Sequence, residues 1–176
     1  MKNFQHSVAM TVTLISFAMM FASLFLGYFL VRFNAPAWPP VEIENMPKLL
    51  PFLSTIVMAL SSLTYWKMEK GEEKKKFWIA TVILGTLFLV MQFILWKALA
   101  AAGIYVGNGN VPSMVYAFTW LHAAHIVVAL GLVFWLGVFI FKKPQGLTEI
   151  KLMNVGKFWH FLGVIWLLMY LMLFVL

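Results

Sequence analysis

Three histidines are the residues of this chain best suited to chemistry. His122 and His125 stand in the apolar stretch FTWLHAAHIVVALG, and His160 stands in KFWHFLGVIW. Residues three apart are neighbours on a helix surface, so His122 and His125 are expected to share one face. Imidazoles in such runs can ligate a metal or a haem, or they can form hydrogen bonds across a helix interface. Which role applies depends on the elements that position them.

Those elements belong to an integral membrane protein. The chain has 176 residues, of which 63% are hydrophobic and 11% are charged, whereas roughly a quarter are charged in an ordinary soluble domain. The chain has no cysteine, which excludes disulfides and thiolate metal sites. The first apolar stretch continues to Val31, which is too long for the core of a cleaved signal peptide.

Five apolar segments are long enough to cross a bilayer, which takes about 20 residues of helix. They cover residues 7–31, 49–66, 77–101, 115–141 and 152–176. Their apolar runs are continuous and lack the alternation of barrel strands. We therefore predict an all-α fold, a polytopic membrane bundle of five transmembrane helices that forms a single domain over residues 1–176.

The distribution of basic residues predicts the orientation. One side of the membrane has three basic residues, Arg32, Lys48 and Lys97, and ten fall on the side shared by the N-terminus, the second loop and the fourth loop. Short basic loops stay in the cytoplasm, so we expect a cytoplasmic N-terminus and an external C-terminus. The net charge of +7 then reflects topology and contact with anionic lipid. No aromatic pattern suited to base stacking accompanies it, so no nucleic-acid partner is expected. The ten residues are Lys2, Lys67, Lys70, Lys74, Lys75, Lys76, Lys142, Lys143, Lys151 and Lys157.

Polar groups at membrane depth are few. No acidic residue lies inside any of the five segments, which disfavours a self-sufficient proton pump or a small transporter. His160 is expected on the opposite side of the membrane from His122 and His125, so the three histidines should not converge on a metal. We expect each imidazole to form a hydrogen bond across a helix interface; a haem-binding membrane anchor for electron transfer is the alternative of another class. The other interhelix polar contacts are expected at Ser61, Ser62 and Gln92.

Six motifs in order resemble the cytochrome c oxidase subunit III family in its short five-helix form. The resemblance covers nearly the whole chain. Three positions depart from the family pattern, because Phe17, Leu95 and Gly163 stand where the family usually has acidic residues, and Trp120 replaces a small residue. The motifs are SFAMMFASLFLGYFLVR, APAWPP, LPFLSTIVMALSSLT, TVILGTLFLVMQFILW, FTWLHAAHIVVALG and FWHFLGVIW.

The resemblance implies a non-catalytic structural subunit of a respiratory haem–copper oxidase in a bacterial plasma membrane. The expected partners are oxidase subunit I, which would carry the haem and copper, the other oxidase subunits and a larger respiratory supercomplex. The expected ligand is structural phospholipid, with no catalytic residue, metal ligand or other cofactor in this chain. Cytochrome c is the expected electron donor; subunit III of a quinol oxidase and an accessory protein of nitric oxide reductase are alternatives. Lipid or subunit contacts are expected at Arg32, Trp38, His122, His125, Trp159 and His160.

Overall fold

A computed structural model describes residues 2–36, 38–40, 43, 46–71, 73–142 and 147–176. Lys143, the side chain of Lys2 and part of the motif APAWPP lie outside the described residues. Five of the helices are long and apolar enough to cross a membrane, and the described residues contain no strand. The prediction of an all-α bundle with five transmembrane helices is therefore confirmed. The elements are α1 (Lys2–Phe33), α2 (Leu49–Glu69), α3 (Lys74–Ala101), α4 (Asn110–Phe141), α5 (Glu149–Tyr170) and a short π-helical continuation, η3 (Leu171–Val175).

The helices extend beyond the apolar segments that predicted them. α2 continues past Trp66 to Glu69, and α5 begins at Glu149. A helix satisfies its backbone hydrogen bonds internally, so it continues through the polar edge of the membrane until a turn residue ends it. Gly71, with a φ of 89°, supplies that turn after α2. The expectation that every span is free of acidic residues is therefore wrong for α2 and α5.

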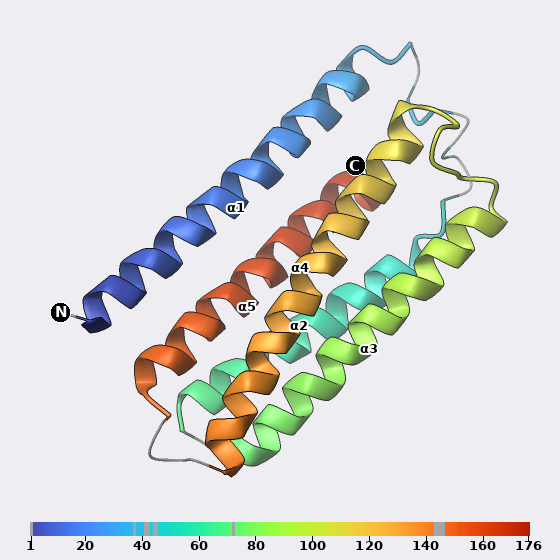
Figure 1. Ribbon diagram of the computed structural model, residues 1–176. Coiled ribbons are helices and arrows are strands. Elements are labelled where there is room, and N and C mark those ends of the chain that lie inside the picture. Colours follow the sequence, from blue (N-terminus) through green and yellow to red (C-terminus); the bar gives the residue numbers. More distant parts are fainter. Residues whose placement is uncertain (1, 37, 41–42, 44–45, 72, 143–146) are drawn as a thin grey trace.

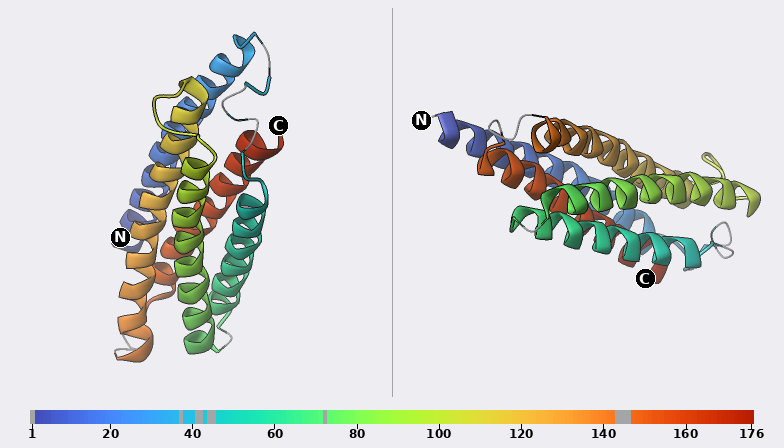
Figure 2. Two further views of the ribbon diagram at one scale, coloured as in Figure 1. Left: turned by 90° about the vertical axis from the view of Figure 1, so that its right-hand side faces the viewer. Right: turned by 90° about the horizontal axis from the view of Figure 1, so that it is seen from below.

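Four helices form a closed bundle, and the first helix lies against its side. α2 packs on α3, α3 on α4, α4 on α5, and α5 returns to α2 (Figure 1). α1 packs against α4 and α5, with much of its surface open (Figure 2). Its outward residues include Ile15, Met19 and Leu26, which are exposed and apolar. Such a surface suits contact with lipid or with another membrane subunit.

The connections between helices divide between the two ends of the bundle. The start of α1, the α2–α3 turn and the start of α5 lie at one end, and the C-terminus lies at the other (Figure 1). The lysines of the α2–α3 turn and of the first turns of α5 therefore share an end. The basic loops thus lie at the same end of the bundle, as the predicted topology requires. That this basic end faces the cytoplasm stays a prediction.

Candidate functional site: polar contacts between membrane helices

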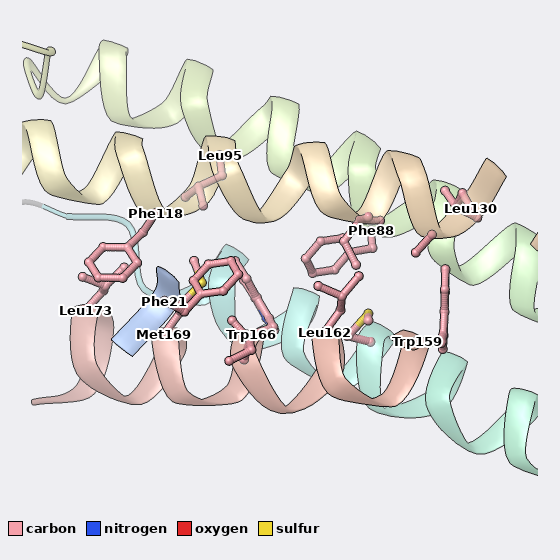
Figure 3. Close-up of a cluster of buried hydrophobic side chains, with 14 of the residues drawn as sticks. Phe21, Phe88, Leu95, Phe118, Leu130, Trp159, Leu162, Trp166, Met169 and Leu173 are labelled. Carbon is pink, nitrogen blue, oxygen red and sulfur yellow. The ribbon is translucent and has the colours of Figure 1, made fainter. Parts of the chain in front are cut away.

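α5 supplies the centre of the apolar core. One face of α5 and η3 carries large side chains at intervals of three or four residues, which places them along one side of the helix (Figure 3). They are Trp159, Leu162, Trp166, Met169 and Leu173, and all are buried. The side chains that meet them come from the other helices: Phe21 of α1, Phe88 and Leu95 of α3, and Phe118 and Leu130 of α4.

Trp159 packs directly on a glycine of α3. A Cβ atom at Gly85 would lie 2.7 Å from Cη2 of Trp159 and 3.0 Å from Cδ2 of Leu130. Trp159 has no exposed surface, so the prediction that it contacts lipid or another subunit is wrong. A tryptophan near the end of a span is commonly interfacial, but this one faces the bundle interior. Its Nε1 atom has no hydrogen-bond partner among the described residues.

His122 is enclosed in the same interior. Its ring centroid lies 5.4 Å from that of Trp166, 5.8 Å from that of Phe88 and 6.3 Å from that of Phe21. The side chain has no exposed surface, so lipid or subunit contact is wrong for His122 as well. Neither ring nitrogen has a hydrogen-bond partner among the described residues. His122 therefore joins α1, α3, α4 and α5 through ring packing.

His125 joins α4 to α1. Its Nδ1 lies 2.6 Å from the carbonyl oxygen of Leu121, one turn back on its own helix. The expected hydrogen bond across an interface is therefore wrong for His125, because the local carbonyl takes that nitrogen. Its ring meets Phe17 edge-on, with 4.6 Å between centroids, and lies 5.6 Å from Phe21. An aromatic contact thus occupies position 17, where the resemblance implies a glutamate.

His160 lies apart from the other two histidines. Trp166, which touches His122, follows His160 by six residues, a rise of roughly 9 Å along α5. Groups of three or more histidine, cysteine, aspartate or glutamate side chains that could hold a metal ion do not occur among the described residues. His160 therefore forms contacts separate from those of His122 and His125, which both lie against Phe21.

His160 is the histidine that bonds across an interface, and it does so with α2. Its Nδ1 lies 2.5 Å from Oγ of Ser62, and its Nε2 lies 3.7 Å from Oε2 of Glu69. Tyr65 meets the His160 ring edge-on, with 5.8 Å between centroids, and its hydroxyl donates to the carbonyl oxygen of Leu152 at 2.9 Å. These four polar side chains, Ser62, Tyr65, Glu69 and His160, are called the α2–α5 polar cluster below.

Glu69 and Tyr65 were missed from the sequence, although a signal for them exists. Ser62, Tyr65 and Glu69 follow one another at intervals of three and four residues, which places them on one face of α2. The apolar segment ends at Trp66, and Glu69 lies beyond it, so its place on the helix is not evident from composition. A helix that continues one more turn carries this carboxylate back to the bundle.

Other polar contacts hold α3 to its neighbours. The hydroxyl of Ser61 donates to the carbonyl oxygen of Thr81 at 3.4 Å, and Oγ1 of Thr64 lies 2.9 Å from Oγ1 of Thr81. Nε1 of Trp96 donates to Oγ1 of Thr119 at 3.1 Å. Gln92 is buried, and neither of its amide atoms has a hydrogen-bond partner among the described residues.

The opposite end of the bundle has a cationic contact. Nη2 of Arg32 donates to the main-chain oxygen of Leu176 at 2.8 Å, and the guanidinium carbon lies 4.8 Å from the centroid of the Trp38 ring. The hydroxyl of Tyr28 donates to the carbonyl oxygen of Met172 at 3.0 Å. Trp38 and Lys48 line a cavity of about 240 Å³ beside the last residues of the chain. Arg32 therefore lies against Trp38, which lines a small cavity.

A groove lies on the outside of the α2–α5 contact. It has a volume of about 410 Å³, and Ser62 and His160 line it together with Gly163 and Trp166. A Cβ atom at Gly163 would come no closer than 3.8 Å to any neighbour, the nearest being Oγ of Ser62. The absence of a side chain at Gly163, where the resemblance implies an acidic residue, leaves this groove open.

Comparison with known proteins gives consistent matches over most of the chain. The sequence model of the cytochrome c oxidase subunit III family matches residues 2–176. A haem–copper oxidase subunit I+III of Aeropyrum pernix is 27% identical over 178 residues, which cover 92% of this chain but 22% of that protein. A probable cytochrome c oxidase subunit 3 of Nocardia farcinica is 28% identical, with 92% of this chain and 83% of the relative covered. A probable quinol oxidase subunit 3 of Staphylococcus epidermidis is 29% identical, with 69% and 64% covered.

Proposed function

Because this chain belongs to the cytochrome c oxidase subunit III family, we propose that it is the non-catalytic subunit III of a respiratory haem–copper oxidase. The observation that carries the proposal is the family match over residues 2–176, supported by five helices that can cross a membrane. The haem, copper and oxygen chemistry would then belong to subunit I. This chain would pack on subunit I and stabilise it in a bacterial plasma membrane, with the basic end of the bundle in the cytoplasm.

Packing on another membrane subunit is supported by the surface of α1 and α4. α1 is largely open, and α4 also exposes Val127, Val128 and Trp135. In the Aeropyrum pernix relative, the name subunit I+III describes both subunits in one protein, which supports direct contact between them. Oxidase subunit I, further oxidase subunits and a respiratory supercomplex are therefore the partners that we propose.

Structural phospholipid is the ligand that we propose. Arg32 offers a cation beside the indole of Trp38, and Lys48 lines the adjacent cavity. A cation next to an aromatic ring at the end of a membrane helix suits a phosphate head group, with its acyl chains along the apolar helices. His125 and His160, which are both half-buried, remain proposed contacts for lipid or subunits.

The non-catalytic role is supported by how the polar side chains are used. The hydroxyls of Ser61, Thr64 and Thr119 contact neighbouring helices, and His125 bonds to its own helix. These groups position helices against one another, and none of these contacts requires a substrate. Cytochrome c is the donor we propose for the complex; the similarity to a quinol oxidase subunit 3 supports quinol as a second candidate.

Purification of the tagged chain from native membranes in mild detergent tests this function. We expect a larger haem–copper subunit to co-elute, with oxidase haem bands in the reduced-minus-oxidised spectrum. Oxygen consumption by the eluate with reduced cytochrome c or with quinol then identifies the donor. Recovery of the chain without any haem–copper subunit would refute the proposal. Haem retained by the chain after every partner is removed, and lost in His122→Ala, would instead support the haem-binding anchor.

A further inference from the structure

The α2–α5 polar cluster contains the one partly buried carboxylate among the described residues. Glu69 has 24% of its side chain exposed, whereas Glu73 has 65% exposed and pairs with Lys76 at 2.9 Å. Oε2 of Glu69 lies 3.7 Å from Nε2 of His160, and the His160 side chain is 33% exposed. A carboxylate and an imidazole are thus held within ion-pair range at the edge of the membrane-spanning bundle.

The backbone of α5 makes room for this carboxylate. A Cβ atom at Gly156 would lie 2.8 Å from Cδ of Glu69 and 2.7 Å from Cε1 of Tyr65. Gly156 precedes His160 by four residues, so both lie on the face of α5 that meets α2. Any larger residue at position 156 would displace Glu69 from His160. Packing on both helices therefore fixes this pair.

Each member of the pair lines a different cavity. Glu69 lines a cavity of about 540 Å³ at the basic end, together with polar groups that include Lys70, Lys74, Thr148 and Glu149. His160 lines the groove of about 410 Å³ at membrane depth. Exchange of protons with water is open to Glu69 through the first cavity, while His160 reaches toward the second. Ser62 forms a hydrogen bond with Nδ1 of His160, the ring nitrogen farther from Glu69.

We propose that Glu69 and His160 bind one exchangeable proton between them. Without this proton the imidazole is neutral, its Nδ1–H donates to Oγ of Ser62, and its unprotonated Nε2 faces the carboxylate of Glu69 at 3.7 Å. When a hydronium ion in the water of the basic-end cavity supplies the proton, the proton passes by way of the Glu69 carboxylate to Nε2, and a water molecule is left behind. One O–H bond of the hydronium ion breaks, one N–H bond forms, and the charge of the pair changes from −1 to zero.

The charges around the pair decide how firmly the proton is held. Burial disfavours the imidazolium ion, whereas the carboxylate of Glu69 favours it. Lys157 on α5 lies within electrostatic range of Glu69 and competes for its negative charge. Lys70, Lys74 and Glu149 face Glu69 across the cavity, and Tyr65 is neutral and donates to Leu152. Removal of the Glu69 charge should therefore leave His160 neutral.

Nitrogen NMR of the full chain in lipid nanodiscs tests the site. With ¹⁵N-labelled histidine, the His160 signals are identified by their absence in His160→Gln and followed as the pH is lowered. We expect Glu69→Gln, which keeps the side-chain shape, to lose the imidazolium signal at pH values where the wild-type chain shows it. Glu73→Gln is the matched control, because it removes an exposed carboxylate four residues away; it should leave the His160 signals unchanged.

Two results would overturn the site. One is an identical His160 titration in Glu69→Gln and the wild-type chain; the other is a His160 ring that stays neutral in the wild-type chain at every pH at which the bundle remains folded. Ser62→Ala tests the same site independently. It removes the hydrogen bond to Nδ1, so it should shift the Nδ1 signal of His160 and leave the Nε2 signal unshifted. Neither readout needs a partner subunit, so failure of this site is distinguishable from failure of the proposed oxidase function.

Discussion

The contact between Gly85 and Trp159 allows a sharp test of the core. In Gly85→Ala the new methyl group would lie 2.7 Å from Cη2 and 3.0 Å from Cζ2 of the indole ring. Trp159 has no exposed surface and stacks on Tyr65, with 6.5 Å between centroids. The ring has no free side toward which it could move, so α3 and α5 must separate to accept the methyl group.

The expected destabilisation follows from two opposing terms. Overpacking of a well-filled core costs about 1–3 kcal/mol, and replacing a helical glycine by alanine returns about 1 kcal/mol through helix propensity. Gly131→Ala in α4 measures the helix-propensity gain alone, because a Cβ atom there has no neighbour within 4 Å. The free energy of unfolding of Gly85→Ala should therefore be lower than that of Gly131→Ala by about 1–3 kcal/mol.

Unfolding in mixed micelles, followed by circular dichroism, measures this difference. Trp159→Phe removes both Cη2 and Cζ2, so a double-mutant cycle should show that part of the Gly85→Ala penalty disappears in the phenylalanine background. Equal stability of Gly85→Ala and Gly131→Ala to within about 0.5 kcal/mol would refute the reasoning. It would mean that the α3–α5 contact is looser than the structure describes.

Two further predictions concern single polar contacts. Trp78→Phe removes the hydrogen bond from Nε1 to the carbonyl oxygen of Val133 at 2.7 Å. It should lower the free energy of unfolding by about 1 kcal/mol in the same micelle assay. Trp120→Phe is the control: Trp120 is 60% exposed, so its replacement should leave the free energy of unfolding nearly unchanged. Arg32→Gln removes a cation that bonds to Leu176 and covers Trp38. We therefore expect faster amide hydrogen exchange at residues 171–176. Unchanged exchange at these residues in Lys97→Gln would show that the faster exchange is specific to the loss of Arg32.

The polar cluster shows how a sequence motif and a contact differ. Ser61 and Ser62 are both predicted to form interhelix contacts. In the structure they contact different helices: Ser61 bonds to α3 and Ser62 bonds to α5. Adjacent residues on a helix point about 100° apart, so one pair can serve two interfaces. Which neighbour each one meets depends on where α3 and α5 stand around α2.

The sequence by itself determined the class of fold, the five spans and the family. Long apolar runs require helices, because a membrane offers no hydrogen-bond partner to an open backbone. Basic loops set the predicted orientation through their position alone. These conclusions depend on local composition and on the order of motifs, and so they need no knowledge of which helix faces meet.

Only the tertiary structure decided the roles of individual polar and aromatic side chains. Trp159 and His122 are interior, Phe17 covers His125, and Glu69 returns from the end of α2 to His160. Ser62 and His160 are separated by 98 residues of sequence, so no local pattern connects them. Their meeting depends on the rotation of α2 and α5 about their axes, and glycines such as Gly156 and Gly163, which have no side chain, let the two helices approach.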